Sequence, residues 1–198
     1  MMTIMLPVKR ICGEIMRYPA AETAARHERI LEEASKLFRE RGLNGVSVPE
    51  IMKAAQLTHG PFYNHFASKD ALVAESIDHA MGAMLRDIMA IAESPTARQQ
   101  LLDSYLSRAH RDSRDVGCVM AGLASEVVRT PPAKGAFTRH LKGILGALSS
   151  KFLSTGKGDT RAEAVRTVSM MVGAMILARA VDDPALSDEI LEQARAGL

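Results

Sequence analysis

The stretch VSVPEIMKAAQLTHGPFYNHF, residues 46–66, decides the fold of the N-terminal part of this chain. Ser47 and Glu50 have the S-x-x-E spacing of a helix capping box, and Pro49 is compatible with the first turn of a helix. Thr58, which follows about two turns later, is a suitable N-cap for a second short helix. Two short helices joined by a tight turn form a helix-turn-helix unit.

Further helices are predicted on both sides of this stretch. Upstream, four apolar residues share one helical face: Ile30, Ala34, Leu37 and Phe38. Gly42 follows where a C-terminal cap belongs. Downstream, Ser68 is a third N-cap, with Asp70 in the first turn of the helix that it begins. A long helix from this point is expected to join two domains.

The remaining sequence also has helical periodicity throughout. The expected segments are residues 71–92, 96–111, 117–129, 134–153, 160–181 and 185–196. Hydrophobic residues make up 47% of the chain and charged residues 24%, which is ordinary for a soluble globular protein. We therefore predict an all-α protein of about nine helices.

Charge and cysteine content narrow the class of protein only slightly. The net charge of +2 is too small to identify a nucleic-acid-binding protein, and no apolar run is long enough to span a membrane. Cys12 and Cys118 suit a reducing compartment, so we expect a cytoplasmic protein without a disulfide framework. Residues 1–15 do not have the pattern of a secretory signal. They are either a flexible arm or precede a natural start at Met16.

Sequence motifs of catalysis and metal binding are missing from the chain. It contains no nucleophile elbow, no H-E-x-x-H, no phosphate-binding glycine-rich loop and no metal-spaced cysteine cluster. His59 and His65 are six residues apart and would lie on different helical faces, so a metal pair is not expected. We predict a protein that is not an enzyme and has no cofactor or metal.

The chain resembles the DNA-binding domain of the TetR family of transcriptional regulators over about residues 24–84. The resemblance rests on the 46–66 stretch with its G-x-F-Y-x-H-F core, on SKDAL at residues 68–72, and on LFRERG at residues 37–42. It implies a flexible extension over residues 1–23, a DNA-binding domain over 24–84 with its helix-turn-helix at 47–66, and a C-terminal effector-binding and dimerisation domain over 85–198.

The predicted recognition helix needs one face for the core and one for DNA. Phe62 and Phe66 are four residues apart and share the buried face, which leaves the helix start for base edges in the major groove. The resemblance places base reading at Thr58, His59, Pro61 and Asn64. It places phosphate contacts or their supports at Ser47, Tyr63, His65 and Lys69. Gly60 would allow the backbone to approach DNA closely.

Alternatives stay open for several of these residues. His65 has either a packing or capping role or a phosphate contact, and Lys69 outside its motif would be an ordinary surface lysine. Gln56 stands where the family commonly has glycine, so a left-handed backbone there would cost about 1–2 kcal/mol unless the turn is reshaped. Pro61 replaces a small or hydroxylated residue and removes one backbone N–H.

The resemblance implies that residues 160–181 and 185–196 form a dimer interface, and simple packing within the domain is the alternative. Six residues are candidates for the ligand pocket: Tyr105, His110, Cys118, Met120, Phe137 and Met171. Cys118 is either a redox switch or a buried cysteine packed as a small hydrophobic residue.

The expected function is that of a homodimeric repressor, released from a palindromic operator by a small-molecule effector. Its partners would be double-stranded operator DNA, a second copy of the chain and the effector, with no membrane. A helix-turn-helix activator or DNA-organising factor without an effector is the alternative.

Overall fold

The computed structural model describes residues 20–58, 60–152 and 159–198, and these residues form helices and connecting turns without a strand. The helices are α1 (Ala20–Arg41), α2 (Val48–Ala54), α3 (Phe62–His65), α4 (Lys69–Ile91), α5 (Ala97–Tyr105), α6 (Arg108–Asp112), α7 (Val119–Val127), α8 (Pro131–Ala147), α9 (Thr160–Ala180) and α10 (Pro184–Ala196). The all-α prediction is confirmed. None of these helices combines the length and apolar character needed to cross a membrane.

The helix count differs from the prediction because residues 96–111 form two helices. Helix α5 ends at Tyr105, and Ser107 begins α6 by accepting a hydrogen bond from the His110 N–H at 3.1 Å. The segment that was expected to be one α-helix over 134–153 also changes character, because α8 gives way to a π-helical segment at Leu148–Phe152.

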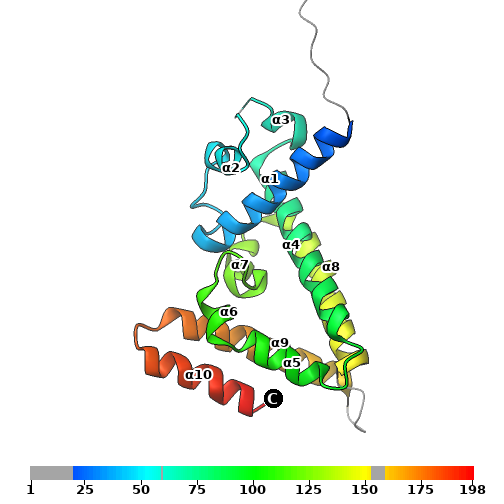
Figure 1. The fold of residues 1–198 in the computed structure, drawn as a ribbon, viewed down its shortest axis with the longest axis vertical. Helices are drawn as coiled ribbons and strands as arrows, with labels where there is room; N and C mark the ends of the chain where they lie inside the picture. The colour runs from blue at the N-terminus through cyan, green and yellow to red at the C-terminus, as the bar shows by residue number, and fades with distance from the viewer. Residues whose placement is uncertain (1–19, 59, 153–158) are drawn as a thin grey trace, which may run out of the picture.

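Helices α1, α2 and α3 gather with the start of α4 at one end of the molecule (Figure 1). Their side chains meet in a core that includes Ile30, Phe38, Ile51, Phe62 and Leu72. Residues 20–23, which the sequence analysis placed in an N-terminal extension, belong to helix α1.

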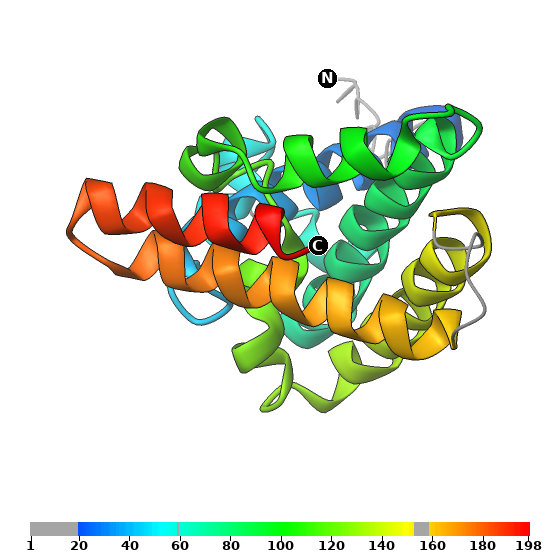
Figure 2. The ribbon, with the colours of Figure 1, turned by 90° about the horizontal axis from the view of Figure 1, so that it is seen from below.

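Helix α4 leaves this domain and runs beside α8 toward the opposite end, where α5 and α9 lie (Figure 1). Helices α9 and α10 form an antiparallel pair along one side, as the view from below shows (Figure 2). Most of α4 thus belongs to the C-terminal domain, while its first turns complete the N-terminal one.

Two polar contacts attach α1 to the C-terminal domain. Glu126 of α7 accepts a hydrogen bond from the Leu43 N–H at 2.8 Å, and Arg39 of α1 donates to the Asp115 carbonyl at 2.6 Å. Between them, Gly42 ends α1 with φ +79°, and a Cβ atom there would lie 2.7 Å from Glu126 Oε1. The left-handed backbone therefore favours glycine here, and a larger residue would also displace the Glu126 carboxylate.

Candidate nucleic-acid interface and ligand cavity

Helix α2 begins with the predicted capping box. The Glu50 N–H donates to Ser47 Oγ at 3.4 Å, and the Ser47 N–H donates to Glu50 Oε2 at 2.8 Å. The Ser47 hydroxyl also donates to Glu50 Oε2 at 2.6 Å, which lowers the pKa of Glu50. Ser47 is exposed, but a phosphate that binds its hydroxyl must compete with Glu50.

The turn between α2 and α3 has a left-handed backbone at Gln56, which is one of the two alternatives given in the sequence analysis. Gln56 has φ +57°, and it is the only residue other than glycine with a positive φ in the described part of the chain. Its N–H donates to the Lys53 carbonyl at 3.0 Å, and the Leu57 N–H donates to the Met52 carbonyl at 2.8 Å. The backbone of this turn is left-handed at Gln56 and accepts the strain of a side chain there.

Helix α3 begins later than predicted. It covers only Phe62–His65, with Pro61 as N-cap and no side-chain cap, so the prediction that Thr58 caps this helix is wrong. A proline disfavours the α conformation of the residue before it, and that residue is Gly60, a poor helix former. Residues 58 and 60 therefore lie in the turn, and His59 lies outside the described residues.

The two faces of α3 separate as predicted. Phe62 and Phe66 are 1% and 2% exposed in the core, whereas Tyr63 is 70% exposed. Asn64, Thr58 and Gly60 are exposed beside it, and apart from the two chain neighbours of Gly60 no described residue has an atom within 4 Å of where its Cβ would stand. Pro61 is half-buried.

His65 lies on the side of α3 that faces α1. Its ring centroid is 5.9 Å from that of His27, which stacks on Phe66 at 4.5 Å. Burial, followed by the charges of His27 and Arg26, lowers the pKa of His65, so its neutral form is favoured. This position matches the packing alternative, and a phosphate contact by His65 stays a prediction.

Lys69 lies in the first turn of α4, which begins as predicted. The Ala71 N–H donates to Ser68 Oγ at 3.1 Å and caps the helix. Lys69 is half-buried and makes no ion pair with any described residue. Its ammonium group is therefore available to a phosphate, beside the free N–H groups of a helix start.

Two adjoining cavities lie in the C-terminal domain, and we call them the apolar and the polar cavity. The apolar cavity, of about 450 Å³, lies among α4, α5, α7, α8 and α9. The polar cavity, of about 370 Å³, lies among α1, α4, α5 and the segment from His110 to Val119. Leu101, Ser104 and Tyr105 of α5 line both, together with Met84 and Asp87 of α4.

Five of the six candidate pocket residues line these cavities. Tyr105 lines both, His110 and Cys118 line the polar one, and Met120 and Met171 line the apolar one. Phe137 lines neither and packs against the main core instead. Another side of the apolar cavity, which was not predicted, consists of Ile88 and Ile91 of α4, Ile144 of α8 and Leu148 of the π-helical segment. Their helical spacing is the same as that of ordinary core residues.

Hydrogen bonds hold the wall of the polar cavity. His110 Nδ1 donates to the Tyr105 carbonyl at 2.7 Å, and His110 Nε2 accepts from the Cys118 N–H at 3.1 Å. This fixes the neutral tautomer, and burial lowers the pKa of His110. The Tyr105 hydroxyl is buried without a nitrogen or oxygen partner among the described residues, and burial raises its pKa. Cys118 is buried, as its packing alternative requires.

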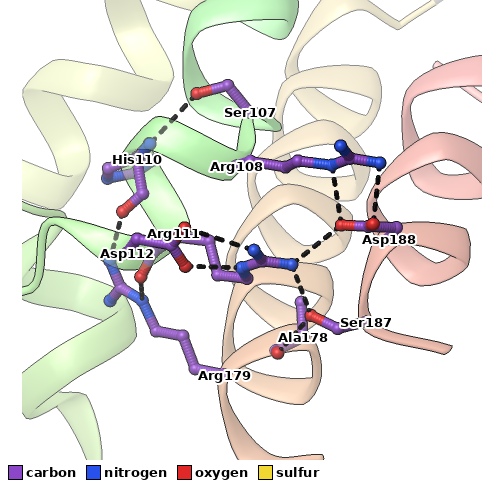
Figure 3. Close-up of polar contacts among 9 residues, drawn as sticks. All are labelled: Ser107, Arg108, His110, Arg111, Asp112, Ala178, Arg179, Ser187 and Asp188. Atoms are coloured by element: carbon purple, nitrogen blue, oxygen red, sulfur yellow. Dashed lines mark hydrogen bonds and ion pairs between the residues drawn. The ribbon is translucent and has the colours of Figure 1, made fainter. Parts of the chain in front are cut away.

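Helix α6 connects this wall to α9 and α10 (Figure 3). Arg179 of α9 donates to the His110 carbonyl at 2.7 Å and to the Arg111 carbonyl at 3.0 Å, which caps the end of α6. Arg111 in turn donates to Ser187 Oγ and Asp188 of α10, both at 2.9 Å. A displacement of the cavity wall would therefore reach α9 and α10 directly.

This architecture defines a class of protein: a helix-turn-helix domain with an exposed recognition face, attached to a helical domain that contains a cavity. Within the described residues, no three His, Cys, Asp or Glu side chains gather so that they could hold a metal ion.

Comparisons with known proteins find a family model that matches the N-terminal part of the chain. Residues 30–76 match the model of the bacterial regulatory proteins of the tetR family. The chain is 30% identical over 112 residues to the transcriptional repressor DhaR of Mycobacterium sp. strain GP1, covering 52% of this chain and 56% of DhaR. It is 25% identical over 136 residues to the transcriptional repressor NemR of Escherichia coli K12, covering 66% of this chain and 68% of NemR.

Solved structures share the fold over most of the chain. Reduced NemR of E. coli superposes with a TM-score of 0.74 at 22% identity, covering 87% of this chain and 94% of that one. A TetR-family regulator from Agrobacterium tumefaciens also has a TM-score of 0.74, at 20% identity over 88% and 98% of the two chains. Residues 30–76 are thus similar to the DNA-binding part of the tetR family of bacterial regulatory proteins, and the chain as a whole shares the fold of these solved structures. Its aligned part spans about half the length of the first curated relatives, 56% in DhaR.

Proposed function

We propose that this chain is a homodimeric transcriptional repressor that binds a palindromic operator and is released by a small-molecule effector in its C-terminal domain. One observation carries the DNA-binding part. Helix α3 buries Phe62 and Phe66 in the core while Tyr63 and Asn64 stand exposed on the opposite face. A recognition helix in the major groove has this division of faces. DhaR and NemR, two proteins to which parts of this chain are similar, are named as repressors.

The proposed contacts follow the exposure of each residue. Tyr63 and Lys69 bind phosphates, with Ser47 and His65 in support, and Thr58, Pro61 and Asn64 approach base edges together with His59. Gly60 lets the turn lie close to the duplex because nothing occupies the space beside it. Phosphate contacts fix the position of the protein on DNA, and base contacts give it sequence preference.

The outer face of α9 supports dimerisation. Met170, Ile176 and Leu177 are 42%, 42% and 57% exposed, although residues of the same helix such as Met175 are fully buried. Gly173 lies between them, and apart from its chain neighbours and the backbone of α9 itself no atom of the described residues lies within 4 Å of where its Cβ would be. Glycine inside a helix lowers helix stability by about 1 kcal/mol relative to alanine. A helix of a second copy that packs closely against this position would explain why a glycine stands there.

The function is tested by footprinting the purified protein on DNA upstream of its own gene. We expect protection of a palindromic site whose halves lie about one helical turn apart, roughly 34–36 Å. A complete lack of protection at low salt would exclude operator binding there. Binding at many unrelated sites without sequence preference would favour the DNA-organising alternative.

Two substitutions separate phosphate contacts from base reading. Lys69→Ala should weaken binding on every sequence and lower the slope of log affinity against log salt by about 1. Asn64→Ala should instead change the preference among operator variants. Lys142→Ala, which removes an exposed lysine on α8, is the control and should leave both properties unchanged. An unaltered salt slope for Lys69→Ala would remove its phosphate role.

A further inference from the structure

The apolar cavity is lined mainly by apolar side chains and by one negatively charged residue. Its floor and walls are apolar side chains of α4, α7, α8 and α9, among them Met120, Ile144 and Met171. Among the described residues that line it there is no Lys, Arg or His, and Asp87 is the single charged one. An anionic ligand would therefore find no counter-charge in this cavity and would meet a carboxylate.

Asp87 lies at the edge shared by the two cavities. It is exposed, and it makes no ion pair or hydrogen bond with any described residue. It also stands about one turn before the end of α4 at Ile91, and the last turn of this helix has no basic residue. The C-terminal end of a helix carries a partial negative charge that attracts cations, so its field adds to that of the carboxylate.

The charged groups of the adjoining polar cavity do not offset the attraction of Asp87 for a cation. It is lined by the carboxylates Glu32 and Asp87, and by Arg39, His79 and His110 as basic groups. Arg39 donates to the neutral Asp115 carbonyl and keeps its charge, but it lies on α1 and lines only the polar cavity. His79 is paired with Glu28 at 3.2 Å, and burial lowers the pKa of His110. Glu32 is paired with Lys36, so Asp87 remains the carboxylate without an ion-pair partner among the described residues that line the two cavities.

An aromatic ring stands at the same edge. Tyr105 lines both cavities, and its ring meets the His110 ring edge-on, with centroids 4.6 Å apart. The face of an aromatic ring attracts a positive charge, and the attraction grows when the cation is partly removed from water.

From the apolar walls, the unpaired carboxylate, the helix end and the aromatic ring, we propose that the apolar cavity binds an apolar molecule with one cationic nitrogen. The cation lies at Asp87 beside Tyr105, and the apolar body lies among Met120, Ile144 and Met171. This inference rests on the proposed function in one respect, since it identifies the chemical class of the effector.

A matched series of three compounds tests the class. 4-Phenylbutylamine, 4-phenylbutanol and 4-phenylbutyrate share one apolar body and differ in the charge of the end group. Calorimetric titration into the full chain near neutral pH should show the amine binding about fivefold more tightly than the alcohol. The carboxylate should bind more weakly than the alcohol, because Asp87 and the end of α4 repel it.

Two variants assign the preference to Asp87. Asp87→Asn should bind the amine no better than the alcohol, while affinity for the alcohol stays near that of the wild type. Asp103→Asn removes an exposed carboxylate from α5 that lines neither cavity, and it should keep the full preference for the amine. Because both positions are exposed, neither change should prevent folding.

Several results would overturn the inference: tightest binding of the alcohol or the carboxylate, an amine preference that survives in Asp87→Asn, or no binding of any of the three compounds. Operator binding, measured in parallel, separates this inference from the proposed function. Amine binding that leaves the operator complex intact would support the ligand class and contradict effector release. Failure to bind DNA without any compound would contradict the proposed function alone.

Discussion

At the scale of single residues, the turn between α2 and α3 places a long side chain in a left-handed backbone conformation. Gln56 has φ +57°, and an L side chain there costs about 1–2 kcal/mol. Gln56→Gly should raise the free energy of unfolding by about 0.5–1 kcal/mol, since glycine removes the strain but adds freedom to the unfolded chain. Urea denaturation measures the change. Gln56→Ala keeps the Cβ and should bring no gain; a less stable Gln56→Gly would show that the turn is not strained.

His110 gives the stability of the protein a pH dependence. Burial lowers its pKa below the ordinary 6.5, so the unfolded chain takes up a proton before the folded one does. The free energy of unfolding is therefore complete above about pH 6.5 and falls as the pH drops toward the lowered pKa. The slope is at most about 1.4 kcal/mol per pH unit for one proton.

The comparison variant for this prediction is His110→Gln, whose amide can both donate and accept. Its unfolding free energy, measured by denaturant titration at several pH values, should fall less steeply on acidification than that of the wild type. His65, whose pKa is also lowered by burial, should leave some slope in the variant. Identical pH profiles of the two proteins would mean that His110 does not titrate in this range.

At the scale of elements, α7 holds the end of α1 through one carboxylate. Glu126 accepts from the Leu43 N–H at 2.8 Å, and Glu126→Ala would leave that N–H without its partner. We expect a loss of about 1–3 kcal/mol in the free energy of unfolding, measured by denaturant titration. Glu126→Gln keeps an acceptor oxygen and should lose less. Equal losses in both variants would indicate that the charge, not the hydrogen bond, supports the contact.

Helix starts set by short side-chain caps could be predicted from the sequence, and those set by their surroundings could not. Ser47 and Ser68 cap α2 and α4 as predicted because the cap and its partner lie within four residues. Thr58 has the same cap chemistry, but Pro61 displaced the start of α3. Ser107 interrupted a periodic segment because it caps α6, which is held in place by Arg179 from a distant helix.

The cavity lining could likewise be predicted only in part from the sequence. Tyr105, His110, Cys118, Met120 and Met171 were predicted to line a pocket, and they line the two cavities. The α4 side could not be predicted, because a residue such as Ile88 has the same periodicity whether it faces a core or a cavity. Asp87 resembles any exposed carboxylate in the sequence, and only its position beside an apolar cavity distinguishes it.

At the scale of the whole molecule, the exposed face of α9 makes a prediction about assembly. In the proposed dimer, Gly173→Leu should give a monomer, because a large side chain would hold apart the two copies of α9 that are proposed to meet there. Size-exclusion chromatography with light scattering gives the molecular mass. Gly135→Leu is a matched control: it fills equally open space on α8 and should leave the mass unchanged. A Gly173→Leu protein with the mass of the wild type would move the interface elsewhere.

Helix α4 is shared by both domains, so a tilt of this helix at the cavities would move the helix-turn-helix domain. Its 23 residues span about 35 Å at 1.5 Å per residue. Lys69, the proposed phosphate contact, lies at one end, and Met84, Asp87 and Ile88 of the cavity walls lie toward the other. A tilt of about 5° about the cavity end would move the first turn by roughly 3 Å, given that length. In the proposed dimer, the same tilt in both protomers would change the distance between the two recognition helices by up to about 6 Å, against the roughly 34–36 Å that separates successive major grooves on one face of DNA.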